Sequence, residues 1–287
     1  MSVQPVTRQE QPRLRYAFNN VMFGDEDIAV SIARVASAGY DAIELVADAQ
    51  RFGAATIRRL ASDAGITVST ICPRLTPETD FSSPDASVRA QALEYIARLA
   101  DFAAEVGAES VIVAPTPCPK LAPDEDPVRE RALAVEGIRA AGERAASVGV
   151  DVVLEAWNRY ETYLLNRQSE SVAFWRETGL TNGGVLADLF HLNIEEESVA
   201  DALRDVGPLL AHVHLADSGR ELPGTGHVDF AGVLRAVREI GYEGYLSFEM
   251  VPRYANPGVF GKLGAPPSEL FDHFAHEAIR RVAELDQ

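Results

Sequence analysis

The chain alternates short apolar runs with longer amphipathic stretches along most of its length. The runs are rich in Val, Ile, Leu and Phe and lie between polar or glycine-containing segments, which is typical of buried parallel strands. They predict eight strands, centred on Leu14–Phe18, Ala42–Val46, Thr67–Ile71, Ser110–Ala114, Val152–Glu155, Val185–Asp188, Ala211–Leu215 and Tyr245–Glu249.

The stretches between the runs carry apolar residues at the spacing of one helix face, as Leu93, Ile96 and Ala100 do. A glycine such as Gly107 follows several of these stretches, where it can close a helix in the left-handed conformation. The segment from Pro115 to Pro127 has no helical spacing and predicts a long loop. Helices are predicted over segments that include Ile28–Val35, Ser87–Val106, Val128–Ser147 and Ser268–Leu285.

Eight alternating strand and helix signals indicate an α/β protein with a parallel sheet. The length of 287 residues fits one (β/α)₈ TIM barrel of about 250 residues with extensions. No segment has the composition of a linker, so we predict a single barrel domain over residues 13–287. Residues 1–12 are polar and are predicted to form a flexible N-terminal arm.

Composition limits the partners. The net charge of −17 opposes contact with a phosphate backbone, so no nucleic acid is expected. No apolar run is long enough for a membrane span, and the start lacks the apolar centre of a secretory signal. The two cysteines, Cys72 and Cys118, are predicted to be reduced structural thiols in a cytoplasmic protein. A small-molecule partner remains the expected one.

Four ligand-type residues end four consecutive apolar runs. They are Glu155, Asp188, His214 and Glu249, and successive members are separated by roughly 30 residues, the length of one strand, its loop and a crossover helix. Because the carboxyl ends of barrel strands share one face, we expect the four side chains to converge there. Carboxylate and imidazole ligands in this mixture favour a divalent ion such as Mn²⁺, Co²⁺ or Mg²⁺.

Each of these residues alone has an ordinary structural explanation, since a carboxylate at a strand end often caps the next helix or pairs with an arginine. Their common spacing favours the metal site. His212 and His214 face the same side of one strand, and His214 lies nearer the carboxyl end. We therefore predict His214 as the ligand and a packing or supporting role for His212.

Several longer motifs resemble one known family. They are TDFSSPDASVR at residues 79–89, LEAWNRYETYLLN, ADLFHLNIEEES, HVHLADSGRELPGTG and FEMVPR. Together they resemble the D-tagatose 3-epimerase and D-psicose 3-epimerase group of the xylose isomerase-like TIM barrels. The likeness extends over most of the chain.

The resemblance implies a function and a set of residue roles. It implies one bound divalent metal, with Mn²⁺ expected first and Co²⁺ or Mg²⁺ as alternatives, and it implies a homo-oligomer, either a dimer or a tetramer. The implied reaction is ketose 3-epimerisation through a metal-stabilised cis-enediolate, with Glu155 and Glu249 as acid and base on opposite faces of the sugar. The metal ligands it implies are Glu155, Asp188, His214 and Glu249, and the substrate-binding residues are Glu161, His191 and Arg220.

Two alternatives differ from this function in class. Trp157 stands where the family usually carries a small or aliphatic residue, and an indole there is expected to contact substrate. Because an indole can stack on an aromatic group, Trp157 favours a metal-dependent lyase, a dehydratase or a deglycosidase of a 3-keto-glycoside, including C-glycosides. A partner subunit is the further expectation in that case. The other alternative, a non-catalytic sugar-binding barrel, is disfavoured by the complete set of four ligand-type residues.

Overall fold

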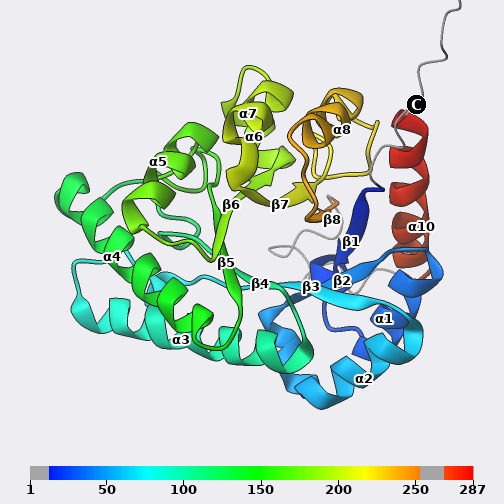
Figure 1. The fold of residues 1–287 in the computed structure, drawn as a ribbon, viewed down its shortest axis with the longest axis horizontal. Coiled ribbons are helices and arrows are strands. Elements are labelled where there is room, and N and C mark those ends of the chain that lie inside the picture. The colour runs from blue at the N-terminus through cyan, green and yellow to red at the C-terminus, as the bar shows by residue number, and fades with distance from the viewer. Residues whose placement is uncertain (1–12, 253–267, 287) are drawn as a thin grey trace, which may run out of the picture.

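The computed structural model describes residues 13–252 and 268–286, and in these ranges eight parallel strands close into one barrel (Figure 1). Each strand pairs with the next in chain order, and the last pairs with the first. The predicted N-terminal arm, residues 1–12, lies outside the described residues. The strands are β1 Arg15–Asn19, β2 Ala42–Val46, β3 Thr67–Cys72, β4 Ser110–Val113, β5 Asp151–Glu155, β6 Gly183–Asp188, β7 Leu210–Leu215 and β8 Tyr245–Phe248.

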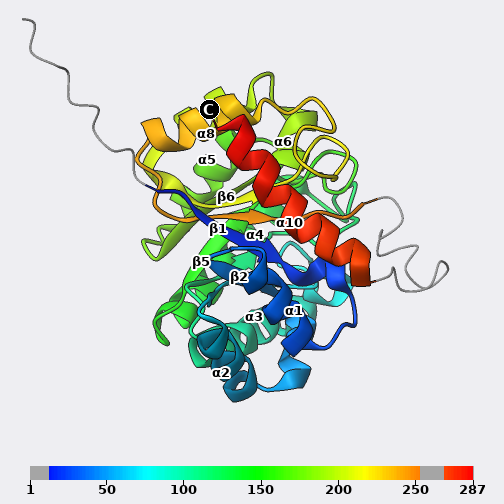
Figure 2. The same ribbon diagram turned by 90° about the vertical axis from the view of Figure 1, so that its right-hand side faces the viewer.

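Helices surround the barrel and cover its outer face (Figure 1). The C-terminal helix lies between α8 and α1 and contacts both, so it closes the outer ring (Figure 2). Among the described helices, none combines the length and the apolar character needed to cross a membrane. The helices are α1 Ile28–Ser37, α2 Ala54–Ala64, α3 Ala86–Val106, α4 Pro127–Ala146, α5 Gln168–Thr178, α6 Leu189–Glu195, α7 Val199–Val206, α8 Phe230–Glu239 and α10 Ser268–Leu285.

Local sequence signals explain where the helices begin and end. The Asp85 carboxylate accepts a hydrogen bond from the Ser87 backbone N–H and caps the start of α3. Gly107 follows α3 at φ 84°, a left-handed conformation that glycine adopts without steric cost. The predicted barrel and the predicted helix limits are confirmed to within one or two residues.

Strand β6 begins two residues before its predicted start. Its first residues are Gly183 and Gly184, which have no apolar side chain and so do not mark a strand in the sequence. A Cβ atom on Gly184 would lie 2.2 Å from the Leu209 carbonyl oxygen, and one on Gly183 would lie 1.9 Å from that of Val152. Glycine is therefore needed there because neighbouring backbone passes too close for any side chain.

Successive side chains of each strand point to opposite faces of the sheet, and this divides the core into two parts. Val152 and Leu154 of β5 belong to the large apolar cluster between the strands and the helices. Val153, between them, packs instead in a small separate cluster with Ile112 and Leu186. Glu155 is two residues beyond Val153 and therefore faces the same side, toward the barrel interior. The strands thus carry polar side chains above an apolar layer inside the barrel.

Candidate functional site

The structure brings the four predicted ligand residues together at the carboxyl ends of their strands. Glu155 and Asp188 are the last residues of β5 and β6, His214 is the penultimate residue of β7, and Glu249 directly follows β8. His214 Nδ1 lies 3.9 Å from Glu155 Oε1 and 3.6 Å from Glu249 Oε2. One ligand atom each from Asp188, His214 and Glu249 lie within 4.8 Å of one another. All four side chains are buried.

Three carboxylates at one buried place repel one another. Burial raises the pKa of Glu155 to about 8; the charge of His214 opposes this rise, and the charges of Glu249 and Asp188 add to it. Burial likewise raises the pKa of Asp188 to about 6, although Arg220 opposes this rise. Both shifts show that negative charge is unfavourable here without a cation.

His214 presents a free nitrogen to this group. Its Nδ1 atom is buried and has no hydrogen-bond partner among the described residues. Its other nitrogen, Nε2, lies 2.9 Å from Glu44 Oε1, and a carboxylate can only accept a hydrogen bond. Burial opposes a charge on this ring, but Glu44 and Glu249 together raise the pKa of His214 well above its ordinary value, so the ring is positively charged when no cation is present. A cation that displaces the Nδ1 proton would leave the Nε2 proton donated to Glu44 and would use the Nδ1 lone pair. An imidazole nitrogen with carboxylate oxygens around it forms a candidate site for a divalent cation.

Arg220 reaches the same carboxylates. Its Nη2 atom lies 2.6 Å from Glu249 Oε2 and 3.3 Å from Asp188 Oδ2, and its guanidinium stacks over the Phe190 ring at 4.7 Å. Its backbone has φ 57°, a left-handed conformation that is uncommon for a residue with a side chain. Its Nε atom is buried and has no partner in the described part of the chain. Arg220 therefore holds one unused hydrogen-bond donor beside the site.

His191 faces the carboxylates with a defined tautomer. The backbone N–H of Asn158 donates to His191 Nδ1 at 3.3 Å, and Asn158 Nδ2 lies 2.8 Å from the same atom. Burial lowers the pKa of His191 well below its ordinary value, so the ring is neutral and its proton is on Nε2. That atom lies 3.4 Å from Asp188 Oδ2 and 3.9 Å from Glu155 Oε1. His191 is therefore suited to donate a hydrogen bond rather than to bind a metal.

The loop after β5 supplies the remaining predicted residues. Glu161 accepts a hydrogen bond from Asn158 Nδ2 at 2.9 Å, and its other oxygen lies 3.4 Å from Cys118 Sγ. Trp157 is half-buried, and its side chain lies near enough to Glu155 to offset part of the rise that burial causes in the pKa of that carboxyl. Trp157 thus lies beside the carboxylates, and Glu161 is linked to His191 through Asn158.

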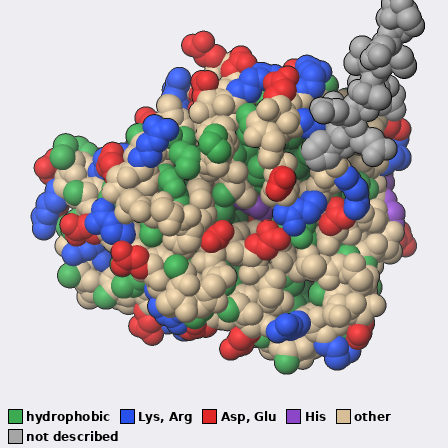
Figure 3. Space-filling model, in the orientation of Figure 1, with side chains coloured by type: hydrophobic (Ala, Val, Ile, Leu, Met, Phe, Trp, Pro, Cys, Tyr) green, Lys and Arg blue, Asp and Glu red, His purple; other side chains and the backbone are tan. Residues whose placement is uncertain are grey.

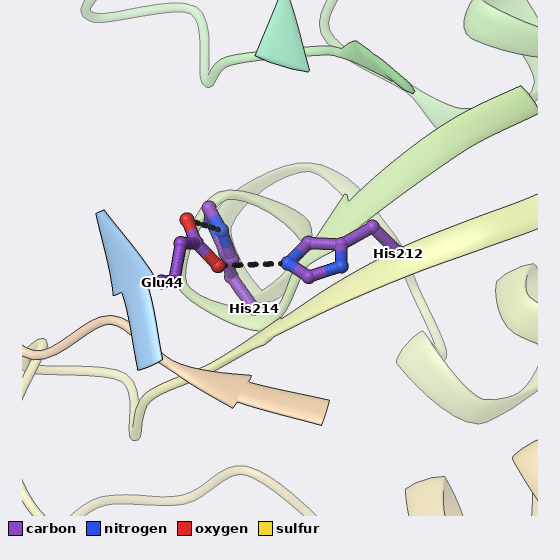
Figure 4. Close-up of side chains that lie close together, drawn as sticks. All are labelled: Glu44, His212 and His214. Atoms are coloured by element: carbon purple, nitrogen blue, oxygen red, sulfur yellow. Dashed lines mark hydrogen bonds and ion pairs between the residues drawn. The ribbon is translucent and has the colours of Figure 1, made fainter. Parts of the chain in front are cut away.

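Sequence reasoning missed two residues that organise the site, Glu44 and Asn158. Glu44 carries a signal, because it is a carboxylate inside the apolar run AIELV and a buried charge requires partners. Figure 4 shows that its partners are His212 and His214. Asn158 gave no such signal, since asparagine in a polar loop is ordinary.

The two cysteines are free thiols that border the site. Cys72 Sγ lies 4.0 Å from Glu249 Oε1, and Cys118 lies next to Glu161 as described above. Burial raises the pKa of Cys118 to about 12, and Glu161 adds to the rise, so this thiol stays protonated at neutral pH.

The face seen in Figure 3 is hollowed near its middle. In Figure 3 a histidine side chain is visible at the middle of the face, recessed between acidic and basic side chains.

A closed parallel barrel with ligand-type side chains at the carboxyl ends of consecutive strands is the arrangement of TIM-barrel enzymes. Residues 32–283 match the family model described as xylose isomerase-like TIM barrel. The chain therefore belongs to the xylose isomerase-like TIM barrel family, which confirms the resemblance seen in the sequence.

The similar proteins indicate the type of reaction. The chain is 35% identical over 229 residues to the D-psicose 3-epimerase of Agrobacterium fabrum, covering 76% of this chain and 77% of that protein. It is 27% identical over 251 residues to the 3-dehydro-D-guloside 4-epimerase of Escherichia coli, covering 85% and 95%. The crystal structure of the D-psicose 3-epimerase from Clostridium cellulolyticum H10 with D-tagatose has a TM-score of 0.85 and 25% identity, covering 96% of this chain and 100% of that one. The protein is a carbohydrate epimerase or isomerase.

Proposed function

We propose that the protein is a divalent-metal-dependent ketose 3-epimerase in which Glu155 and Glu249 transfer protons at one carbon of the sugar. The observation that carries this proposal is the convergence of three buried carboxylates around the unpartnered Nδ1 atom of His214. The similarity to D-psicose 3-epimerases supports the same reaction.

The residues fit the metal that such a reaction uses. We propose Glu155, Asp188, His214 and Glu249 as its ligands, with Mn²⁺ expected first and Co²⁺ or Mg²⁺ as alternatives. The unpartnered Nδ1 atom and the raised pKa values of Glu155 and Asp188 are what a site built for a cation should show without it. When bound, the ion supplies positive charge that stabilises the negative charge developing on substrate oxygens.

Glu155 and Glu249 carry the proton transfer. Glu155 is the last residue of β5 and Glu249 directly follows β8, and their carboxylate oxygens lie 3.9 and 3.6 Å from His214 Nδ1. One glutamate removes the proton from the carbon beside the ketone, and the electron pair of that C–H bond moves toward the carbonyl oxygen, giving a flat enediolate. The other glutamate returns a proton to the opposite face. The formula of the sugar is unchanged and one carbon is inverted.

The other predicted residues bind and orient the sugar. Arg220, whose Nη2 atom contacts Glu249, and His191, whose Nε2 atom lies 3.4 Å from Asp188 Oδ2, would donate hydrogen bonds to sugar oxygens. The Glu161 carboxylate would accept from a sugar hydroxyl. Trp157, which is half-buried beside Glu155, would cover one side of the substrate.

A second substrate class has specific support. The Escherichia coli relative is named for a 3-dehydro-D-guloside, which is a keto sugar with a further group attached. An indole at Trp157 can stack on such a group. The same carboxylates would then transfer protons beside the ketone of a keto-glycoside, and a lyase would result if the enolate expelled its leaving group.

Deuterium exchange tests the proton transfer. In D₂O, with Mn²⁺ and a series of ketohexoses and 3-keto-glycosides, we expect deuterium at the inverted carbon and no other change in formula. The Glu249→Gln variant should lose this exchange, because a neutral amide cannot take up the proton. Inversion without deuterium uptake would contradict the two-glutamate mechanism. An unsaturated or shortened sugar with a released group would identify the lyase.

A further inference from the structure

Glu44 of β2 is a fully buried carboxylate inside the barrel, and in the described part of the chain it contacts no lysine or arginine. Its Oε1 atom lies 2.9 Å from His214 Nε2, and its Oε2 atom lies 2.9 Å from His212 Nε2 (Figure 4). Asn19 Nδ2 donates a third hydrogen bond to Oε1 at 2.9 Å. All of these partners are hydrogen-bond donors, so Glu44 is satisfied as an anion.

These contacts fix the orientation of His214. The two imidazole rings stand at 84° to each other with centroids 5.1 Å apart, and each directs its Nε2 atom to a different oxygen of Glu44. Because His212 holds one oxygen, the carboxylate cannot rotate away from the other ring. His214 Nε2 therefore keeps its proton and donates it in a hydrogen bond to Glu44, while Nδ1 faces Glu155 and Glu249.

Asn19 extends this support to a second ligand. Its Oδ1 atom accepts from the Val21 backbone N–H at 2.8 Å, which fixes the orientation of the amide. Its Nδ2 atom then lies 2.9 Å from Glu44 Oε1 and 3.3 Å from Glu249 Oε1. The Asn19 amide therefore lies between two carboxylates, those of Glu44 and Glu249, and contacts both.

Glu44, His212 and His214 also have the spacing of a possible cation site of their own. The observed hydrogen bonds disfavour that use, because both Nε2 atoms donate to Glu44 and an ion there would have to displace two of them. If Glu44 instead supports His214, both observed hydrogen bonds are kept.

We propose that Glu44 is a positioning residue that orients His214, held in turn by His212, so that His214 Nδ1 is kept ready for the metal ion. This inference rests on the proposed metal centre. Hydrogen-bond partners behind a metal-binding histidine commonly contribute 10- to 100-fold to metal affinity. Glu44 itself does not touch the ion or the sugar.

The test is Glu44→Gln, because glutamine has nearly the same shape but only one acceptor oxygen. Its NH₂ group would face one of the N–H groups that now donate a hydrogen bond to Glu44, and that hydrogen bond would be lost. We expect the dissociation constant for Mn²⁺, measured by calorimetry on the full chain, to rise about 10- to 100-fold. Histidine ¹⁵N spectra with Mg²⁺ should show the single Nε2–H form of His214 in the wild type and a second form in Glu44→Gln.

Glu130→Gln is the matched control. Glu130 is also fully buried and hydrogen-bonded, to Tyr163 and to the Glu125 backbone. Unlike Glu44 it also pairs with a lysine, Lys120, at 3.2 Å, and it lies on α4 outside the barrel interior. Its substitution should lower stability and leave Mn²⁺ affinity and the His214 spectrum unchanged. If Glu44→Gln fails to fold, His212→Leu should weaken Mn²⁺ binding, and His212→Gln, which restores a donor toward Glu44, should weaken it less.

The outcomes separate the two proposals. If Glu44→Gln binds Mn²⁺ as tightly as the wild type while Asp188→Ala does not bind it, the positioning role is wrong and the metal centre stands. If Asp188→Ala binds Mn²⁺ as the wild type does, both are wrong. Two ions per wild-type chain and one in Glu44→Gln would make Glu44 a ligand and overturn the positioning role.

Discussion

At Glu155 burial and repulsion by neighbouring carboxylates both disfavour the charged form, and this has a measurable consequence. Its carboxyl lies among Asp188, Glu249 and the uncharged Nε2–H form of His191. Burial raises its pKa from 4.5 to about 8, so the folded, metal-free protein keeps a proton there that the unfolded chain releases.

The stability of the metal-free protein should therefore fall as pH rises from 7 to 9. A group with a raised folded pKa stabilises the fold fully below its unfolded pKa, and this contribution is lost as pH rises through about 8. The loss between pH 7 and 9 should be on the order of 1 kcal/mol. Denaturant unfolding in the presence of a chelator measures this loss of stability. The range from pH 7 to 9 lies above the ordinary pKa of histidine, so ordinary histidines contribute little to it.

Glu155→Gln is the control for this pH dependence, since a glutamine has no proton to lose. Its unfolding free energy should change less over the same range, and saturating Mn²⁺ should also remove the fall in the wild type. An equal slope in Glu155→Gln would assign the effect to another group.

At this scale the sequence predicted the four proposed ligands and a supporting role for His212, but not Glu44, the residue that His212 contacts. Glu155, Asp188, His214 and Glu249 follow a spacing that one βα unit imposes, and spacing can be read from the chain. Glu44 contacts His214 across 170 positions, a pairing that only barrel closure creates. The lone carboxylate in AIELV indicates that partners exist without indicating which ones they are.

At the scale of elements, one buried cation ties two loops together. Lys120, in the loop before α4, places its Nζ atom 2.8 Å from Asp80, 2.8 Å from Asp124 and 3.2 Å from Glu130. Its backbone N–H donates to the Glu161 carbonyl at 2.9 Å. The long loop predicted over Pro115–Pro127 is thus fixed to the loop that carries a predicted substrate residue.

Lys120→Met should lower the free energy of unfolding by about 3–5 kcal/mol, because it leaves the acidic partners of a buried cation uncompensated. Since the Glu161 loop loses its anchor, KM for the sugar should rise while Mn²⁺ content stays at the wild-type level. Unfolding curves, steady-state kinetics and elemental analysis measure the three effects.

Arg129→Met is the comparison, because Arg129 forms an exposed pair with Glu125 and such pairs contribute about 0–1 kcal/mol. Loss of bound Mn²⁺ in Lys120→Met would show that the loop supports the metal ligands instead of Glu161.

The elements themselves were largely predictable, because the strands are continuous apolar runs and the helices show regular spacing with capping signals. The start of β6 was not, since Gly183 and Gly184 are selected by the backbone that passes beside them. Glycine in a sequence more often indicates a turn than a strand.

At the scale of the whole molecule, the proposed ligands lie at the ends of four consecutive strands. Glu44, which supports His214, connects them to a fifth strand, β2, across the barrel. An ion at this place would connect β5 through β8 and, through His214, β2. Its binding should therefore stabilise the entire barrel and not a single loop.

Mn²⁺ at 100 times its dissociation constant should raise the free energy of unfolding by about 2.7 kcal/mol, and a chelator should remove the increase. The Asp188→Ala variant should show almost none of it. Glu161→Gln, which changes a residue outside the proposed ligand set, should keep it in full. A wild-type increase that persists in Asp188→Ala would place the ion elsewhere.

The two halves of the barrel contribute differently to one pocket. All four proposed ligands belong to β5–β8 or follow them, whereas the first half supplies Asn19 and Cys72 near Glu249 and Cys118 near Glu161. Substitutions near the end of β3 are therefore expected to change the shape of the proposed sugar site without changing the four proposed ligands. The choice of sugar should therefore be open to change through the first half of the barrel, provided that Asn19 and Glu44, which support the proposed ligands, are kept.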